Sequence, residues 1–126
     1  MRTEIISVFT KREDIERIVD RIRIFKFEEL GRHRHFEFSV DEKLVDMEEI
    51  KETFSSFELI KSIEIRENEK KQKHYSLNYE LKDGTFVVIS LSFNLERPMI
   101  INAFHVKRNY KNFEKSLRKN YSKKFI

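Results

Sequence analysis

The chain has 126 residues, of which 39% are hydrophobic and 38% charged, and its formal net charge is +4. This length suits one core, so we expect residues 1–126 to fold as a single domain. The chain has no cysteine, which excludes disulfide bonds, thiolate metal sites and a cysteine nucleophile. No apolar run approaches the ~20 residues that span a bilayer, and no signal peptide is visible. We therefore expect a cytoplasmic protein without a cofactor.

The N-terminal third predicts a strand and then a helix. Residues 4–9 are β-prone and predict a short strand. Thr10 and Glu13 have the spacing of a capping box, and the apolar residues after them recur at helical spacing, which predicts a helix over 11–23. Residues 24–38 fit a helix and a strand equally well.

The middle of the chain changes from helical to strand periodicity. A second capping box over 46–49 predicts a short acidic helix with Met47, Ile50 and Phe54 in the core. From Phe57 on, apolar and polar residues alternate, which predicts four antiparallel strands. Their expected ranges are 57–66, 74–82, 85–93 and 99–106.

Asp83-Gly84 is the strongest local signal, because a type I′ hairpin turn needs two residues that tolerate positive φ. A two-residue turn places Lys82 opposite Thr85 and Leu81 opposite Phe86, which fixes the register of both strands. The other face of the sheet then carries a mixed set: His74, Ser76, Asn78 and Glu80 beside Phe93, Leu91, Ile89 and Val87. We expect helices to cover one face and a groove to form on this half-polar one.

The closing residues 109–121 predict a helix with a narrow apolar stripe and a row of cations beside it. Residues 107–126 contain eight bases and one acid, whereas 41–58 contain seven acids and two bases. A basic end attracts polyanions such as RNA, and it equally fits a solvated helix face or a contact with acidic surface on a second copy. The nucleic-acid contacts that we predict on this helix are Lys111, Lys115, Arg118 and Lys119.

These elements predict an α+β fold: N-terminal helices, a four-stranded antiparallel β-meander and a C-terminal basic helix. Four stretches, HFEFS (35–39), DMEEI (46–50), YELKDGTFVVI (79–89) and IINAF (100–104), resemble the barnase–EndoU–colicin–RelE superfamily of metal-independent ribonucleases, in its phage-derived branch. The resemblance implies a RelE-like ribonuclease, either a toxin held by an antitoxin or a protein of a mobile element. That branch usually carries a histidine and an arginine in its first helix, where residues 40–44 here have neither.

Cleaving RNA without a metal requires one group to deprotonate the 2′-hydroxyl, another to protonate the leaving 5′-oxygen, and fixed cations at the phosphate. Residues 104–110 contain suitable side chains. We predict His105 as the acid or base, Lys107 and Arg108 as the phosphate clamp, and Tyr110 as a hydroxyl donor or stacking surface. A polar strand end that leads into a basic helix is the plainer interpretation of this segment.

The other histidines are weaker candidates. His74 begins a strand and pairs with His105 only if both strand ends meet at one rim; otherwise it is an exposed histidine without a role. His33 and His35 alternate as two metal ligands would, but no third ligand stands at suitable spacing, so we predict no metal site. The phosphate contacts that we predict beside them are Arg32 and Arg34.

Three functions are therefore open. The first is the ribonuclease, and the second is a non-catalytic nucleic-acid-binding module of the same fold. The third is an interaction module that pairs its acidic segment with a basic tail, on a second copy or on a partner. We expect RNA as the principal partner, an antitoxin or a homodimer as the protein contact, and no membrane.

Overall fold

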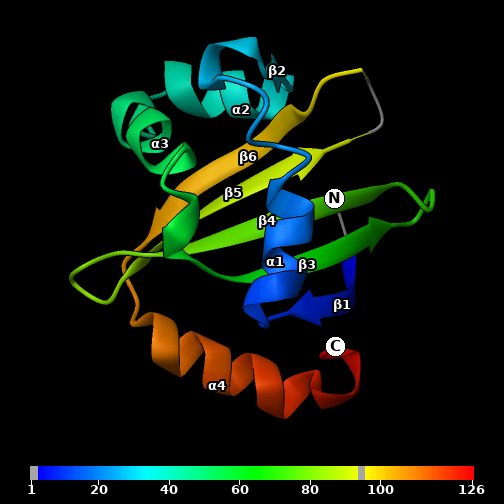
Figure 1. Cartoon of the computed structure of the whole chain (residues 1–126). Helices are drawn as coiled ribbons and strands as arrows, with labels where there is room; N and C mark the ends of the chain where they lie inside the picture. Colours follow the sequence, from blue (N-terminus) through cyan, green and yellow to red (C-terminus); the bar gives the residue numbers. More distant parts are fainter. Residues whose placement is uncertain (1–2, 94–95) are drawn as a thin grey trace.

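In the computed structural model, which describes residues 3–93 and 96–126, six strands form one sheet in the order β1-β3-β4-β5-β6-β2 (Figure 1). The strands are β1 (Thr3–Phe9), β2 (Gly31–Arg32), β3 (Ile60–Asn68), β4 (Lys73–Glu80), β5 (Phe86–Ser92) and β6 (Met99–Val106). The α-helices are α1 (Arg12–Val19), α2 (Arg34–Asp41), α3 (Met47–Phe54) and α4 (Tyr110–Asn120), and the 3-10 turns are η1 (Phe27–Glu29), η2 (Phe57–Leu59) and η3 (Ser122–Lys124). Within the described ranges, no helix is long and apolar enough to cross a bilayer.

The α+β class and the antiparallel sheet are confirmed, but the predicted arrangement is wrong in two respects. The four predicted strands form β3 to β6, and a strand is added at each edge of that meander. At one edge β1, which precedes every helix, runs antiparallel to β3, and at the other the two-residue β2 runs parallel to β6. Both pairings join segments far apart in the chain, so local periodicity could not reveal them.

Helix α1 is shorter than predicted and begins differently. It ends at Val19 instead of residue 23, and tight turns follow, in which the Ile22 N–H donates to the Val19 carbonyl at 2.8 Å. The predicted capping box is absent, because the residue that precedes the helix is Lys11 and no side chain caps it. The apolar stripe itself is confirmed, since Ile15, Ile18, Val19 and Ile22 are all buried in the main core.

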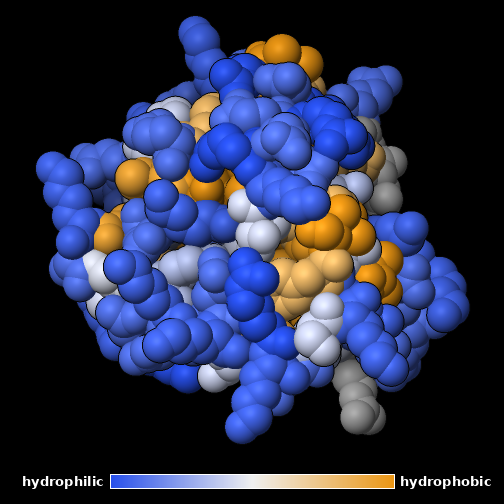
Figure 2. Space-filling view, turned by 60° about the horizontal axis from the view of Figure 1, so that its bottom comes forward, coloured by the Kyte–Doolittle hydropathy of each residue, from blue (hydrophilic) through white to orange (hydrophobic). Residues whose placement is uncertain are grey.

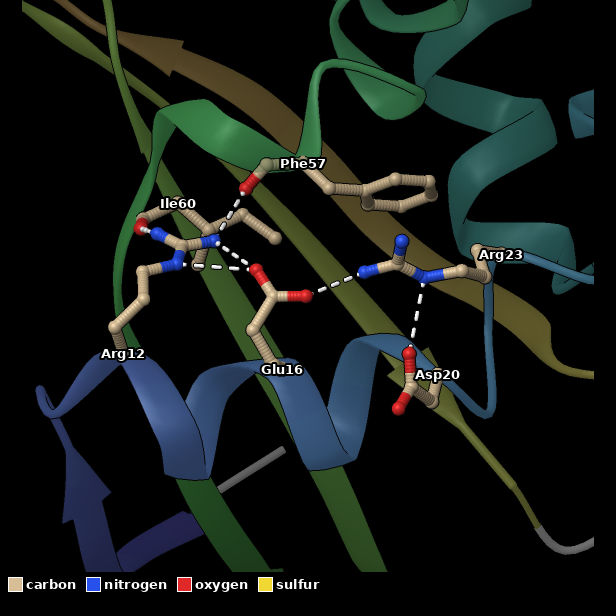
Figure 3. A network of polar contacts seen from close by, with 6 residues as sticks. All are labelled: Arg12, Glu16, Asp20, Arg23, Phe57 and Ile60. Carbon is tan, nitrogen blue, oxygen red and sulfur yellow. Dashed lines mark hydrogen bonds and ion pairs between the residues drawn. The ribbon is translucent and has the colours of Figure 1, made fainter.

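Arg12 fastens α1 to the start of the meander (Figure 3). Its guanidinium donates to the carbonyls of Ile60, at 2.7 Å, and Phe57, at 3.0 Å. The same guanidinium contacts the carboxylate of Glu16, which also receives a bond from Arg23. These bonds, led by the one from Arg12, hold the pKa of Glu16 below its usual value. The exposed network thus satisfies the carbonyls at the bend where η2 passes into β3.

The ambiguous residues 24–38 form η1, β2 and the first half of α2. Phe36 lies inside α2 and is fully buried, whereas Phe38 on the same helix is 59% exposed. The second predicted helix start is confirmed, because the Asp46 carboxylate accepts the backbone N–H groups of Glu48 and Glu49 at the beginning of α3.

The β4–β5 hairpin closes through a three-residue loop, so the predicted register is wrong by one residue. Gly84 has a φ of +89°, but Asp83 lacks the positive φ that a type I′ turn also requires. Tyr79 therefore lies opposite Val87 rather than Val88. Because side chains alternate along a strand, this shift exchanges the faces of β5 relative to β4.

The observed register exchanges the β5 residues between the two faces. The half-polar face therefore carries Phe86, Val88, Ser90 and Ser92 in place of the predicted Phe93, Leu91, Ile89 and Val87. Leu77, Tyr79 and Ile89 lie on the face that α1, α2 and α3 cover, in the main core. On the opposite face Ser76 lies beside Ser90 instead of beside an apolar residue. This second face is the one that the N-terminal helices leave uncovered.

Candidate functional site

Helix α4 covers only one end of the second face. Its start packs Tyr110 against Phe86 and Val88 on β5, and farther along Leu117 packs against β1. The predicted apolar stripe of this helix is thus confirmed as its contact surface, except that Tyr121 is exposed. Among the described residues, no helix packs on the other end of this face, where β3 and β5 end and β4 and β6 begin.

A groove of about 770 Å³ lies on this face, and we call it the polar groove. Its apolar lining includes Val88, Met99, Ile101, Phe104 and Val106. Its polar lining includes His33, His35, Glu64, Arg66, Lys73, His74, Ser76, Asn78, Ser90, Ser92, Asn102 and Arg108. Glu64 is the one acid among the lining residues that the structure describes, against three permanent cations, so the polar groove suits an anionic ligand.

A belt of polar side chains crosses the floor of the groove. Glu64 pairs with Ser76 on the next strand, Ser76 with Ser90, and Ser90 with Asn102, so four neighbouring strands place polar residues side by side. The hydroxyls of Ser76 and Ser90 are hydrogen-bonded at 3.0 Å. A sheet face that only packs against a helix is usually apolar, because buried polar groups cost free energy unless they are paired.

Glu64 forms the β3 end of this belt. It is 2% exposed, and the guanidinium of Arg66 neutralises it through bonds of 2.6 and 3.1 Å. The Asn78 amide donates to the second carboxylate oxygen at 2.8 Å and to Ser62 at 3.0 Å. The amide oxygen of Asn78 is buried without a partner among the described residues. The pair therefore holds one anion and one cation in fixed positions on the floor.

His74 lies directly beside Arg66 on the neighbouring strand. Burial lowers the pKa of the His74 imidazole, and the charge of Arg66 lowers it further. At neutral pH this histidine is uncharged, which is the state that can accept a proton.

His33 and His35 line the polar groove from the side of α2. Their rings stack with centroids 4.9 Å apart, and the His33 Nδ1 accepts the backbone N–H of His35 at the start of the helix. Burial, followed by the charges of His35 and Arg34, lowers the pKa of His33. In the described ranges no group of three metal-binding side chains comes together.

The predicted catalytic His105 lies on the other face of the sheet. It pairs with Val87, which belongs to the main core, and its ring contacts Glu49 of α3 at 3.1 Å and Thr85 at 2.7 Å. The Thr85 hydroxyl in turn donates to Asp83 and, as the main cause, lowers the pKa of that carboxyl. His105 thus joins α3 to the β4–β5 hairpin.

His74 and His105 do not meet at one rim. Tyr75 lies opposite Leu91, which places His74 near the end of β5, whereas His105 lies opposite Val87 near its start. Since the two histidines also lie on opposite faces, they cannot contact the same phosphate.

The other predicted catalytic residues are divided between the faces. Lys107 lies beside His105, with its Nζ 3.3 Å from the ring, as predicted from their spacing. Arg108 lines the polar groove. Tyr110 is buried at the start of α4, where its hydroxyl lies 2.7 Å from Ser62 and 3.0 Å from Glu114. Burial raises the pKa of this phenol, so Tyr110 anchors α4 and stays protonated.

The predicted nucleic-acid contacts on α4 and beside His33 are not among the residues that line the groove. Arg32 and Arg34 are exposed next to His33, and Arg32 lies over the Phe27 ring. On α4, Arg118 is bonded to Glu114 and lies over Phe125. The remaining cations of this helix are exposed: Lys111, Lys115 and Lys119. The end of the molecule that carries α4 presents a largely hydrophilic surface, interrupted by a few apolar areas (Figure 2).

The sequence interpretation missed Glu64 and Arg66. In the strand predicted over 57–66 they are only two of the polar positions that alternate with Ile63 and Ile65. In the fold they lie in a strand with a neighbour on each side, where a carboxylate needs a fixed partner. One of these neighbours, β1, is far away in the chain, so no local signal marked the two residues.

Comparisons with known proteins give this site no precedent. No protein-family model, curated protein or solved structure matches the chain.

Proposed function

We propose that the chain binds RNA in the polar groove and cleaves it without a metal, as a RelE-like ribonuclease. The observation that carries this proposal is the placement of Glu64, Arg66 and His74 on adjacent strands of the open face. A fixed cation and a neutral imidazole side by side are two of the groups that phosphodiester cleavage requires. The permanent cations Lys73 and Arg108 on the groove walls add attraction for the RNA backbone.

The chemistry assigns a separate role to each group. His74 takes the proton from the 2′-hydroxyl, and the 2′-oxygen attacks the phosphorus. The bond from phosphorus to the 5′-oxygen breaks, and that oxygen takes a proton from His35, which lines the same groove. The products are a 2′,3′-cyclic phosphate and a free 5′-hydroxyl. Arg66, held in place by Glu64, lies where it can stabilise the negative charge that grows on the phosphate oxygens.

The test uses purified protein and total RNA in EDTA. We expect wild type to produce fragments with cyclic phosphate ends, and His74→Ala and Arg66→Ala to lose at least 100-fold in rate, as is typical when a general base is removed (~10²–10⁴). His105→Ala is the matched control, since it removes an imidazole from the opposite face and should retain cleavage. Intact RNA in every lane would reject the nuclease. Loss of cleavage in His105→Ala, with cleavage retained in His74→Ala, would contradict a catalytic site in the polar groove and place it on the helix-covered face instead.

The effect of expression on cell growth tests whether the proposed ribonuclease is a toxin. Expression of wild type should arrest growth, and His74→Ala should relieve the arrest while His105→Ala should not. Healthy growth with abundant folded wild-type protein would count against a toxin.

RNA binding without cleavage is the second candidate. The observation in its favour is that Glu64 is buried and fully engaged by Arg66 and Asn78, which leaves the floor without an accessible carboxylate. Binding that weakens steeply with salt while the RNA stays intact would support this alternative over the nuclease.

A further inference from the structure

The lining of the polar groove bears on which form of RNA it accepts, an inference that rests on the proposed function. Its floor is half apolar, whereas a surface that contacts only phosphates is polar throughout. Val88 and Val106 lie on this floor beside Phe104, all on the central strands β5 and β6.

Phe104 is the feature that stands out on this floor. It lies on β6 opposite Val88 and is 39% exposed, although Ala103 before it is fully buried. The other two phenylalanines of the groove are less accessible: Phe86 on β5 is 2% exposed, and Phe113 of α4 is partly buried against it, with the ring centroids 4.7 Å apart. Phe104 is therefore the most exposed phenylalanine among the described residues that line the groove.

Cations flank this apolar floor. Arg66 and Lys73 lie toward one wall and Arg108 at the end near α4. The arrangement provides an apolar surface in the middle and positive charge at the margins. A nucleotide strand has the matching pattern when its bases are unpaired, because the bases then turn inward and the phosphates stay outside.

From this complementarity we infer that the ligand of the polar groove is single-stranded RNA, with one base stacked on Phe104 and the neighbouring phosphates at Arg66 and Arg108. Duplex RNA does not fit the pattern, since its bases are stacked on one another and its surface offers only phosphates and 2′-hydroxyls to a sheet. Every base can stack on an aromatic ring, so the groove distinguishes single strands from duplexes but does not distinguish one sequence from another.

The test is fluorescence anisotropy with a labelled 12-nucleotide RNA and with the same RNA annealed to its complement, using His74→Ala to prevent cleavage. We expect the single strand to bind at least tenfold more tightly than the duplex. Phe104→Ala should weaken single-strand binding by about 5- to 150-fold, the effect of losing one stacked base. Phe104→Tyr should restore it, which separates loss of stacking from loss of folding.

Phe38→Ala provides the matched control, because Phe38 is an exposed phenylalanine on α2 that does not line the groove. Equal affinity for duplex and single strand, or unchanged affinity in Phe104→Ala, would overturn the inference while leaving RNA cleavage by the groove intact. Failure of both RNA forms to bind would overturn the inference and the proposed function together.

Discussion

His105 Nδ1 lies 3.1 Å from Glu49 Oε2, and this contact joins the end of β6 to α3 on the helical side of the sheet. The side chain of His105 is 14% exposed, and its other nitrogen lies 2.7 Å from the Thr85 hydroxyl. Both ring nitrogens of His105 contact other side chains of the fold. The histidine that we predicted as the catalytic acid or base therefore has a structural role.

The first prediction concerns the stability of His105→Ala. Loss of the bonds to Glu49 and Thr85 should lower the free energy of unfolding by about 1–2 kcal/mol, since the pair is partly screened by solvent. Urea denaturation measures this change. Glu49→Gln should cost less, because an amide still reaches the ring, and an unchanged midpoint in His105→Ala would show that these contacts do not form.

The second prediction concerns the ion pair between the buried Glu64 and the part-exposed Arg66. Glu64→Ala leaves Arg66 and Asn78 without their shared acceptor, so we expect a loss of about 2–4 kcal/mol in the free energy of unfolding. Glu16→Ala is the control, because Glu16 is an exposed carboxylate on α1 that also pairs with arginines, Arg12 and Arg23. Its removal should lower the free energy of unfolding much less. Equal losses in the two variants would contradict the burial of Glu64.

The third prediction is a pH dependence. Burial lowers the pKa of His74 in the folded chain, so below the ordinary histidine pKa of ~6.5 the unfolded chain binds more protons than the folded one. Stability should therefore be unaffected by this residue above that pH and fall as the pH drops through 6.5 toward the folded pKa. Denaturation at several pH values should show a smaller decline in His74→Gln than in wild type. His33, whose pKa is lowered too, contributes in the same direction.

The fourth prediction separates structure from chemistry at Tyr110. Its raised pKa keeps the phenol protonated, and its hydroxyl bonds to Ser62 and Glu114 rather than facing the open groove. Tyr110→Phe should cost about 1 kcal/mol of stability and retain RNA cleavage. If Tyr110→Phe unfolded at the same temperature as wild type but no longer cleaved RNA, the result would contradict this prediction and show that the Tyr110 hydroxyl takes part in catalysis.

The meander was predictable from the sequence because its strands alternate cleanly, and the C-terminal helix because its apolar stripe is local. The site was not predictable, because it depends on one residue of register at Gly84. A type I′ turn and a three-residue loop with glycine at the positive-φ position share the same Asp-Gly signal. Only the second places Ser76 beside Ser90 and so assembles the polar belt.

The same limit applies to the candidate residues. His74 and Arg108 were selected by residue type, and the fold places both in the polar groove. His105 was selected by type as well, but strand alternation turns it toward α3. Glu64 and Arg66 carry the ordinary polar period of an outer strand, and the position of Glu64 becomes a central one because β1 adds to the edge beside it.

The most direct test of the central claim uses the four histidines of the chain as internal probes. NMR spectra of the imidazole side chains are recorded on protein isotopically labelled at histidine. Single-stranded RNA is added under conditions that prevent its cleavage. His33, His35 and His74 line the polar groove, and their signals should shift, whereas the signal of His105 on the opposite face should stay in place. A shift confined to His105, or no shift at saturating RNA, would contradict an RNA site on the open face.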